Sequence, residues 1–119
     1  MEVMIIDNEP EMIEVIKEIV LSLKFKGEII TFQDSETALE HINKYFKTMR
    51  LIFCDNDLGR GKRTGAEFSK ILSKNPKAYF ILMSGNKVED SEAAEFFLKT
   101  NGNYVDYFDE ILKKTRFIS

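Results

Sequence analysis

Residues 51–57 read Leu-Ile-Phe-Cys-Asp-Asn-Asp, an apolar run that ends in acidic and amide side chains. Four consecutive apolar residues are typical of a strand covered on both faces, as in a parallel sheet. Polar residues directly after such a strand lie at the carboxyl edge of the sheet, where open α/β folds bind their ligands. The stretch therefore predicts a buried strand that presents Asp55 at a binding edge.

Two further stretches repeat this pattern. Residues 3–6 (VMII) are followed by DNE, and residues 79–83 (YFILM) are followed by SGN. If the strands that end near residues 7 and 55 are neighbours, Asp7 and Asp55 converge on one cleft. Clustered carboxylates repel each other, and a hard cation such as Mg²⁺ relieves that repulsion. We therefore expect a magnesium site in this cleft.

Patterns with helical spacing alternate with the strands. A further strand is expected over 28–32 and a weaker one over 104–108. Helices are expected over 10–23, from 35 to about 46, from about 68 to just before Pro76, from Asp90 or Ser91 to just before Gly102, and around 111–117. Parallel neighbours need crossover connections, so this alternation predicts an α/β fold, a doubly wound five-stranded parallel sheet with helices on both faces.

Composition limits the classes of function. The 119 residues suit one domain over 1–119, and the net charge of −3 gives no global basic field for direct binding of nucleic acid. The single cysteine, Cys54, cannot form an internal disulfide, and no apolar run is long enough to span a bilayer. We expect a soluble cytoplasmic protein with no membrane partner. The single histidine, His41, falls on the polar side of its helix, where we expect it to be exposed.

Three segments carry a resemblance to a known family. "MIIDNEPEM", "LIFCDNDLG" and "FILMSG" resemble the strand ends of response-regulator receiver domains of two-component systems. The resemblance implies a flavodoxin-like strand order 2-1-3-4-5 and a phosphoacceptor role for Asp55. It also implies that a histidine kinase or a phosphotransfer protein donates the phosphoryl group. The chain itself would then have at most self-phosphorylation and self-dephosphorylation chemistry, and would not be a conventional enzyme. A homodimer through the fourth and fifth strand–helix units is plausible for this fold.

The resemblance also implies roles for the neighbours of Asp55. The metal ligands are Asp7, Asn8 in the place of a second acidic residue, Asp55 and the main-chain carbonyl of Asp57. Ser84 is the hydroxyl residue of the switch, and Gly85 leaves space for the phosphoryl group. Asp57 and Asn86 flank the site, where they could tune the access of water to the phosphoryl group.

Three departures from the family pattern stand out. Asn8 brings no charge to the metal, although Glu9 could compensate if its side chain turns inward. The loop from Asp55 to Gly65 is about two residues longer than usual. The lysine expected at the end of the fifth strand is missing, because that strand, placed over 104–108, leads to Tyr107 or Asp109 instead. We expect Lys62, Arg63 or Lys87 to substitute for it.

Two alternatives to a phosphorylatable receiver stay open. A pseudo-receiver, which binds partners without phosphorylation, is favoured by Asn8 and by the missing lysine. A haloacid-dehalogenase-like phosphohydrolase is suggested by "LIFCDND" followed by "FILMSGN". In that family, however, the nucleophile ends the first core strand, whereas Asp55 comes after two complete strand–helix units. The stretch "GRGKRTG" (residues 59–65) does not have the spacing of a nucleotide-binding loop.

Overall fold

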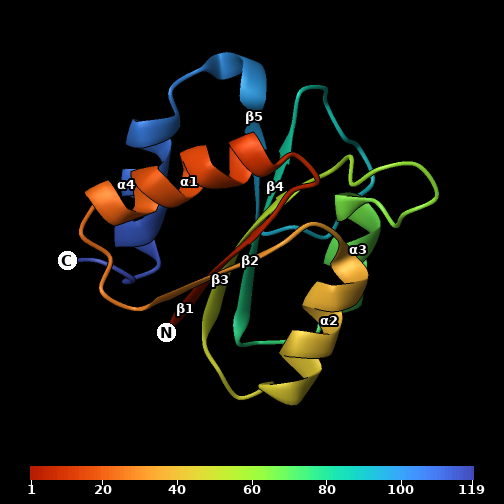
Figure 1. Cartoon of the computed structure of the whole chain (residues 1–119), viewed down its shortest axis with the longest axis horizontal. Helices are drawn as coiled ribbons and strands as arrows, with labels where there is room; N and C mark the ends of the chain where they lie inside the picture. Colours follow the sequence, from red (N-terminus) through yellow and green to blue (C-terminus); the bar gives the residue numbers. More distant parts are fainter.

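Five parallel strands form one sheet in the order β2-β1-β3-β4-β5 in the computed structural model, which describes residues 1–119. The strands are β1 (Glu2–Ile6), β2 (Glu28–Phe32), β3 (Arg50–Asp55), β4 (Ala78–Ser84) and β5 (Glu95–Leu98). The helices are α1 (Pro10–Ser22), α2 (Ser35–Lys44), α3 (Gly65–Leu72) and α4 (Tyr104–Lys114), with a 3₁₀ turn, η1, over Lys99–Asn101. Helices α1 and α4 cover one face of the sheet, and α2 and α3 cover the other (Figure 1). The predicted fold class and strand order are confirmed.

The continuous apolar runs are explained by burial on both sides of the central strands. In β3, Leu51 and Phe53 join the core under α1 and α4, whereas Ile52 and Cys54 join the core under α2 and α3. Every residue of β1 and β3 is buried, including Glu2 and Arg50 at their first positions. Strands β2 and β5 form the two edges and keep partly exposed side chains.

The winding of the sheet changes direction between β1 and β3. From β1 the chain adds β2 on one side, and it then crosses to the other side to add β3, β4 and β5 in turn. Ile6 pairs with Cys54 in the register of these two strands. The next residue of each chain segment, Asp7 and Asp55, therefore lies at the carboxyl edge of the sheet, directly beside the other. Open α/β sheets bind ligands at this switch point.

The last third of the chain differs from its sequence-based interpretation. The helix predicted from Asp90 or Ser91 to just before Gly102 is wrong, because residues 95–98 form strand β5 and only residues 99–101 form a short 3₁₀ turn. The strand predicted over 104–108 is also wrong, because residues 104–114 form helix α4. The apolar side chains of this segment recur at the spacing of a helix and pack against the core beneath α1: Tyr104, Tyr107, Phe108, Ile111 and Leu112.

No helix connects β4 to β5. Residues 85–94 form an irregular segment that packs Val88 and Ala93 against the core under α2 and α3. Its contacts to α3 are few: the backbone N–H of Glu92 donates to Ser69 Oγ at 3.0 Å, and Lys70 pairs with Asp90 at 2.6 Å. None of the helices that are present combines the length and the apolar character needed to cross a bilayer.

A buried polar cluster lies where the central strands begin. The Arg50 Nε donates to Glu2 Oε1 at 3.0 Å, and its side chain is completely buried. Glu2 Oε2 lies 2.9 Å from Nε2 of His41, whose side chain is only 17% exposed. The expectation that His41 is exposed is therefore wrong, since the ring turns from α2 toward the buried carboxylate of β1.

Candidate functional site

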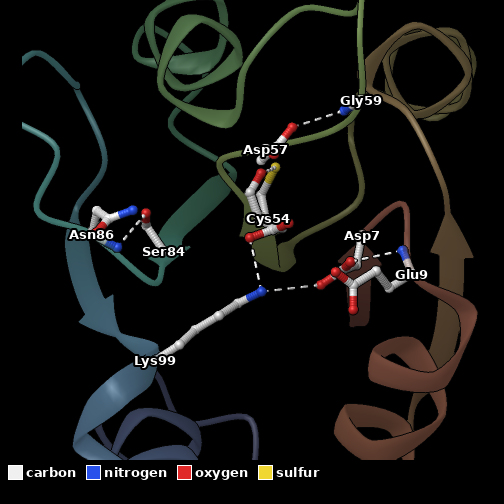
Figure 2. Close-up of polar contacts among 9 residues, drawn as sticks. Asp7, Glu9, Cys54, Asp57, Gly59, Ser84, Asn86 and Lys99 are labelled. Carbon is white, nitrogen blue, oxygen red and sulfur yellow. Dashed lines mark hydrogen bonds and ion pairs between the residues drawn. The ribbon is translucent and has the colours of Figure 1, made fainter.

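Asp7, Asp55 and Lys99 form a compact charged cluster at the carboxyl edge of the sheet. Lys99 Nζ lies 2.8 Å from Asp55 Oδ1 and 3.4 Å from Asp7 Oδ2. Figure 2 shows the Lys99 side chain reaching from the end of β5 across the edge toward Asp7. The second oxygen of Asp7 accepts the backbone N–H of Glu9 at 2.9 Å, which fixes the orientation of the carboxylate. The predicted convergence of Asp7 and Asp55 is thus observed.

Burial sets the protonation behaviour of this cluster. The Asp7 and Asp55 side chains are 2% and 10% exposed. Burial raises the pKa of Asp55 and of Asp7, because removal from water disfavours the charged carboxylate. Burial alone would lower the pKa of Lys99, but its hydrogen bond to Asp55 and the two negative charges raise that pKa. Two carboxylates and one ammonium leave the cluster with an excess of negative charge that favours a second cation.

Lys99 corrects the prediction that the lysine at the end of the fifth strand is missing. The lysine is present, directly after β5, and the error came from placing that strand over 104–108. The residues proposed as substitutes do not take this position. Lys62 Nζ lies 3.8 Å from Asp34, at the start of α2, and Lys87 is exposed and forms no ion pair.

The other predicted metal ligands surround the carboxylates less closely. Asn8 is exposed, and a Cβ on Gly59 would meet its amide nitrogen at 3.6 Å, so this side chain lies beside the β3–α3 loop. The Asp57 side chain is also exposed, and its Oδ1 accepts the backbone N–H of Gly59 at 3.1 Å. Glu9 contributes its backbone N–H to Asp7, as described above, rather than a carboxylate contact.

Ser84 ends β4 on the other side of Asp55. It is buried, and its hydroxyl oxygen accepts the backbone N–H of Asn86 at 3.1 Å (Figure 2). A Cβ on Gly85 would meet no heavy atom within 4 Å, so the space beside Ser84 is open. The Asn86 side chain is exposed at the rim of the site.

The loop between β3 and α3 is fixed at both ends. The Asn56 side-chain oxygen accepts the backbone N–H of Ala66 at 2.9 Å, and its carbonyl accepts that of Gly65 at 2.9 Å. A Cβ on Gly65 would lie 2.4 Å from the Asp55 carbonyl oxygen, so only glycine allows α3 to approach β3 this closely. A reciprocal capping box between Thr64 and Glu67 then starts the helix. The carbonyl and side chain of Asp55 are thereby held on rigid elements.

The donor set of the cluster suits Mg²⁺. Two carboxylates face each other across a position that already holds one cationic group, the Lys99 ammonium. No third acidic, histidine or cysteine side chain is placed to hold a metal ion together with Asp7 and Asp55, so the remaining ligands of a metal would be amide or carbonyl oxygens and water. Mg²⁺ commonly keeps several waters and needs only one or two protein carboxylates.

The residue of this charged cluster that sequence reasoning missed is Lys99. Its signal was the apolar run Phe96-Phe97-Leu98, which contains two aromatic residues typical of strands and ends at a lysine. The alternative helical spacing of Ala94, Phe97 and Leu98 concealed that signal. Gly102, in a left-handed conformation with φ of 75°, and Asn103 then separate this strand from α4.

Comparison with known proteins identifies similar chains. The sequence profile described as the response regulator receiver domain matches residues 3–107. No curated protein matches the sequence.

The fold is similar to several solved structures. An uncharacterized protein from Neptuniibacter caesariensis shares 21% identity at a TM-score of 0.78, over 98% of this chain and 87% of its own. The isolated REC domain of RcsB from Salmonella enterica serovar Typhimurium, in the presence of the phosphomimetic BeF₃⁻, shares 19% identity at a TM-score of 0.75, over 100% and 99%. The response regulator protein TrrA from Thermotoga maritima, in complex with Mg²⁺-BeF, shares 25% identity at a TM-score of 0.69, over 94% and 96%.

Proposed function

This chain belongs to the response regulator receiver domain family, and on that premise we propose that Asp55 accepts a phosphoryl group with Mg²⁺ and thereby switches partner binding. The observation that carries this proposal is the cluster in which Lys99 Nζ lies within 3.4 Å of both Asp7 and Asp55. Receiver domains exchange phosphoryl groups with histidine kinases or phosphotransfer proteins, which are therefore the proposed donors.

The proposed reaction is a displacement at phosphorus. An oxygen of Asp55 attacks the phosphorus atom of the donor, and the new O–P bond forms while the bond from phosphorus to the donor breaks. The leaving atom of the donor keeps the electron pair of the broken bond. Asp55 is suited to this role because it ends a fully buried strand and its neighbouring loop is anchored by Asn56 and Gly65.

Lys99 supplies the positive charge on the protein side. Its ammonium contacts Asp55 at 2.8 Å, so a phosphoryl group on Asp55 would lie within reach of a charge-assisted hydrogen bond from Nζ. Mg²⁺, when bound, would neutralise charge on the carboxylates and on the phosphoryl oxygens. The residues proposed to hold it are Asp7, Asp55, the main-chain carbonyl of Asp57 and the amide of Asn8.

Ser84 and Gly85 are the proposed link between the phosphoryl group and the rest of the molecule. Ser84 accepts the backbone N–H of Asn86 at 3.1 Å, which leaves its own O–H free to donate to a phosphoryl oxygen. Through this hydrogen bond, a shift of Ser84 toward the phosphoryl group would move the start of the irregular segment between β4 and β5. Asn86 and Asp57, both exposed at the rim, are proposed to tune the access of attacking water.

The test is a Mg²⁺-dependent phosphoryl adduct on Asp55. We expect intact-mass spectrometry to detect one phosphoryl group after incubation with Mg²⁺ and acetyl phosphate, and peptide mapping to place it on Asp55. Asp55→Asn should abolish the adduct. Asp57→Asn is the matched control, because it removes a neighbouring carboxylate but keeps the main-chain carbonyl proposed to hold Mg²⁺, so it should change the lifetime of the adduct without abolishing it. Labelling that persists in Asp55→Asn would contradict the assignment.

A pseudo-receiver is the second candidate, and Asn8 is the observation that favours it. An amide in the place of a second acidic residue weakens the charge available to Mg²⁺. The other argument for this candidate, a missing lysine, no longer applies because Lys99 is present. Absence of any adduct, under conditions that label an ordinary receiver domain, would favour this candidate. Asp55 ends the third strand, which does not favour a haloacid-dehalogenase-like enzyme.

The remaining expectations concern assembly and location. Cytoplasmic location stays a proposal, in keeping with the family. The proposed homodimer through the fourth and fifth units loses part of its basis, because the fourth unit lacks its helix and residues 85–94 are irregular. Any such interface would use β5 and α4 alone.

A further inference from the structure

The amino end of the sheet, where the parallel strands begin, gathers exposed cations. The connections into β2, β3 and β4 each bring two lysines to this end of the molecule: Lys24, Lys26, Lys44, Lys47, Lys74 and Lys77. All are exposed, and none forms an ion pair. The end of α4 adds exposed Arg116, which is also unpaired. This end of the molecule therefore carries a local excess of positive charge, although the net charge of the chain is −3.

These loops form one continuous face. Met1 lines one hollow together with Lys24 and Lys26, and a second hollow together with Tyr45. Met49 lines a third hollow together with Lys77. Backbone hydrogen bonds join the same loops, from Glu2 to Met49 at 3.0 Å and from Arg50 to Lys77 at 2.9 Å. The chain therefore brings lysines that are far apart in sequence onto a single surface.

Large apolar side chains stand among these lysines. Phe46 is 60% exposed and Tyr45 is 47% exposed, both in the turn after α2. Met49 at 47% and Met1 at 60% lie beside them on the same face. The Lys47 ammonium lies 5.9 Å from the centroid of the Phe46 ring, and the Lys44 ammonium lies 5.4 Å from the centroid of the Tyr45 ring. The face thus combines exposed apolar side chains with exposed lysines, two of which lie against the aromatic rings.

The needs of the fold explain only part of this face. Lysines near the ends of helices interact favourably with the helix dipole, which accounts for Lys44. The dipole does not explain why Phe46 projects into solvent, and exposed apolar groups within a charged rim are typical of interaction sites. Of the acidic residues at this end, Glu2 is buried against Arg50, and Asp109, which lines the hollow of Lys24 and Lys26, is paired with Lys113 at 3.0 Å. Glu28 is exposed.

We propose that this face binds an anionic lipid surface, with the lysines contacting headgroups and Phe46 and Met49 entering the interfacial region. Juxtaposed lysines and aromatic or aliphatic side chains are what peripheral membrane binding requires, and no spanning helix is needed for it. The expectation of no membrane partner was based only on the lack of an apolar run long enough to span a bilayer.

The side chains favour lipid over nucleic acid. Lysine predominates on this face, whereas arginine is the preferred residue for phosphates of nucleic acids. Base stacking needs free ring faces, but the rings of Tyr45 and Phe46 each carry a lysine ammonium. Because Asp55 lies at the opposite, carboxyl end of the sheet, membrane binding would leave the phosphorylation site open to solvent. The proposal does not depend on phosphorylation.

The test is co-sedimentation of the full chain with lipid vesicles. We expect sedimentation with vesicles made of equal parts phosphatidylcholine and phosphatidylserine, release by added salt, and no sedimentation with phosphatidylcholine alone. Each cation at an anionic surface changes affinity roughly fivefold, so Lys44→Gln with Lys47→Gln should weaken binding about 25-fold. Phe46→Ser with Met49→Ser should weaken binding without any change in charge.

The matched control is Lys62→Gln with Lys87→Gln, which removes the same charge from the carboxyl end. These variants should bind the vesicles as the wild type does, and circular dichroism melting should show that all of them fold. An equal loss in the control pair would attribute binding to net charge and overturn the proposal. Failure of the wild type to sediment, or binding to a single-stranded oligonucleotide without vesicle binding, would also overturn it.

Discussion

Lys99 lies between two carboxylates that repel each other, and this one side chain lowers the electrostatic cost of the site. Its ammonium is shared between Asp55 at 2.8 Å and Asp7 at 3.4 Å. A magnesium ion would compete for the same oxygens. Stability, metal affinity and phosphoryl chemistry at this site are therefore coupled through one residue.

Replacement of Lys99 should expose this coupling. Lys99→Met removes the cation and leaves two buried carboxylates unpaired, so the free energy of unfolding should fall by about 3 kcal/mol. Mg²⁺ should then raise the stability of Lys99→Met more than that of the wild type, because the ion no longer displaces an ammonium. Urea unfolding with and without Mg²⁺ measures both effects. Lys87→Met, at an exposed and unpaired position, should show neither.

The raised pKa of Asp55 predicts a specific pH dependence. Because burial raises the pKa of Asp55 above its ordinary value of 3.8, there is a pH range above 3.8 in which the folded state holds a proton that the unfolded state has already lost. The contribution of Asp55 to stability should therefore fall as pH increases from about 3.8 up to the raised pKa, opposite in sign to the contributions of Asp34, Glu67 and Glu95, whose pKa values are lowered. The stability of Asp55→Asn relative to the wild type should rise over this range, and the variant should be at least as stable as the wild type at neutral pH. Urea unfolding of both proteins across this pH range, in the absence of Mg²⁺, tests the prediction, and a relative stability of Asp55→Asn that falls with pH would contradict it.

At the level of helices and strands, close contacts determine where Asp55 can lie. Helix α3 begins at Gly65, directly against the carbonyl of Asp55, and the Thr64–Glu67 capping box fixes that start. Strand β5 has only four residues, and its first residue, Glu95, accepts hydrogen bonds from Tyr79 of β4 and from Lys114 of α4, each at 2.6 Å. These contacts hold the short edge strand whose end carries Lys99.

Gly65 should be intolerant of any side chain. A Cβ at this position would lie 2.4 Å from the Asp55 carbonyl oxygen and 2.8 Å from Leu82 Cδ1, and the first of these neighbours is backbone that cannot rotate away. We expect Gly65→Ala to lower the free energy of unfolding by about 3 kcal/mol and to reduce phosphorylation of Asp55. Gly85→Ala is the control, since its Cβ would meet nothing within 4 Å. Equal stabilities for these two variants would show that α3 can shift.

The central elements could be predicted from the sequence because each is buried in a way that its pattern reveals. The runs at 3–6, 51–54 and 79–83 are apolar at every position, which only a strand between two helical layers requires. The segment 85–114 could not be predicted in the same way. An edge strand is half exposed, so Phe96 and Phe97 do not form a longer apolar run, and their spacing with Ala94 fits a helix equally well.

The residues of the candidate site could be predicted only where the strand before them could be predicted. Asp7, Asp55 and Ser84 directly follow strands that the pattern identifies, so their convergence follows from the topology alone. Lys99 follows the one strand that was misplaced, and the sequence-based interpretation therefore lost it. The contact between Gly65 and the Asp55 carbonyl depends on the distance between α3 and β3, which no pattern in the sequence encodes.

On the scale of the whole molecule, the two ends of the sheet have different chemistry. The carboxyl end carries the buried carboxylates of the site, and the amino end carries unpaired lysines with Phe46 among them. The amino-end face could not be predicted from the sequence because its lysines are distributed along residues 24–77 and meet only after the strands align. One buried ion pair, Arg50 with Glu2, lies beneath that face.

This ion pair should stabilise the fold only as a pair. Glu2→Gln alone would leave the fully buried Arg50 guanidinium without its carboxylate, and we expect a loss of about 3 kcal/mol in the free energy of unfolding. The double variant Glu2→Gln with Arg50→Met removes both charges and should recover most of that loss. A double-mutant cycle by urea unfolding measures the coupling, and additive effects of the two substitutions would contradict it.

Because residues 85–94 between β4 and β5 form a coil and not a helix, their sequence can vary more freely than that of the other connections. Residues 85–94 contact the rest of the protein through two apolar side chains, a few backbone groups and the exposed Lys70–Asp90 ion pair, without a helical face that must pack against α3. Substitutions at the solvent-facing positions 87, 89 and 90 should therefore be accepted widely. A change in the number of residues would shift β5 along the sheet, so the length of this coil, more than its composition, keeps the lysine that follows β5 opposite its aspartates.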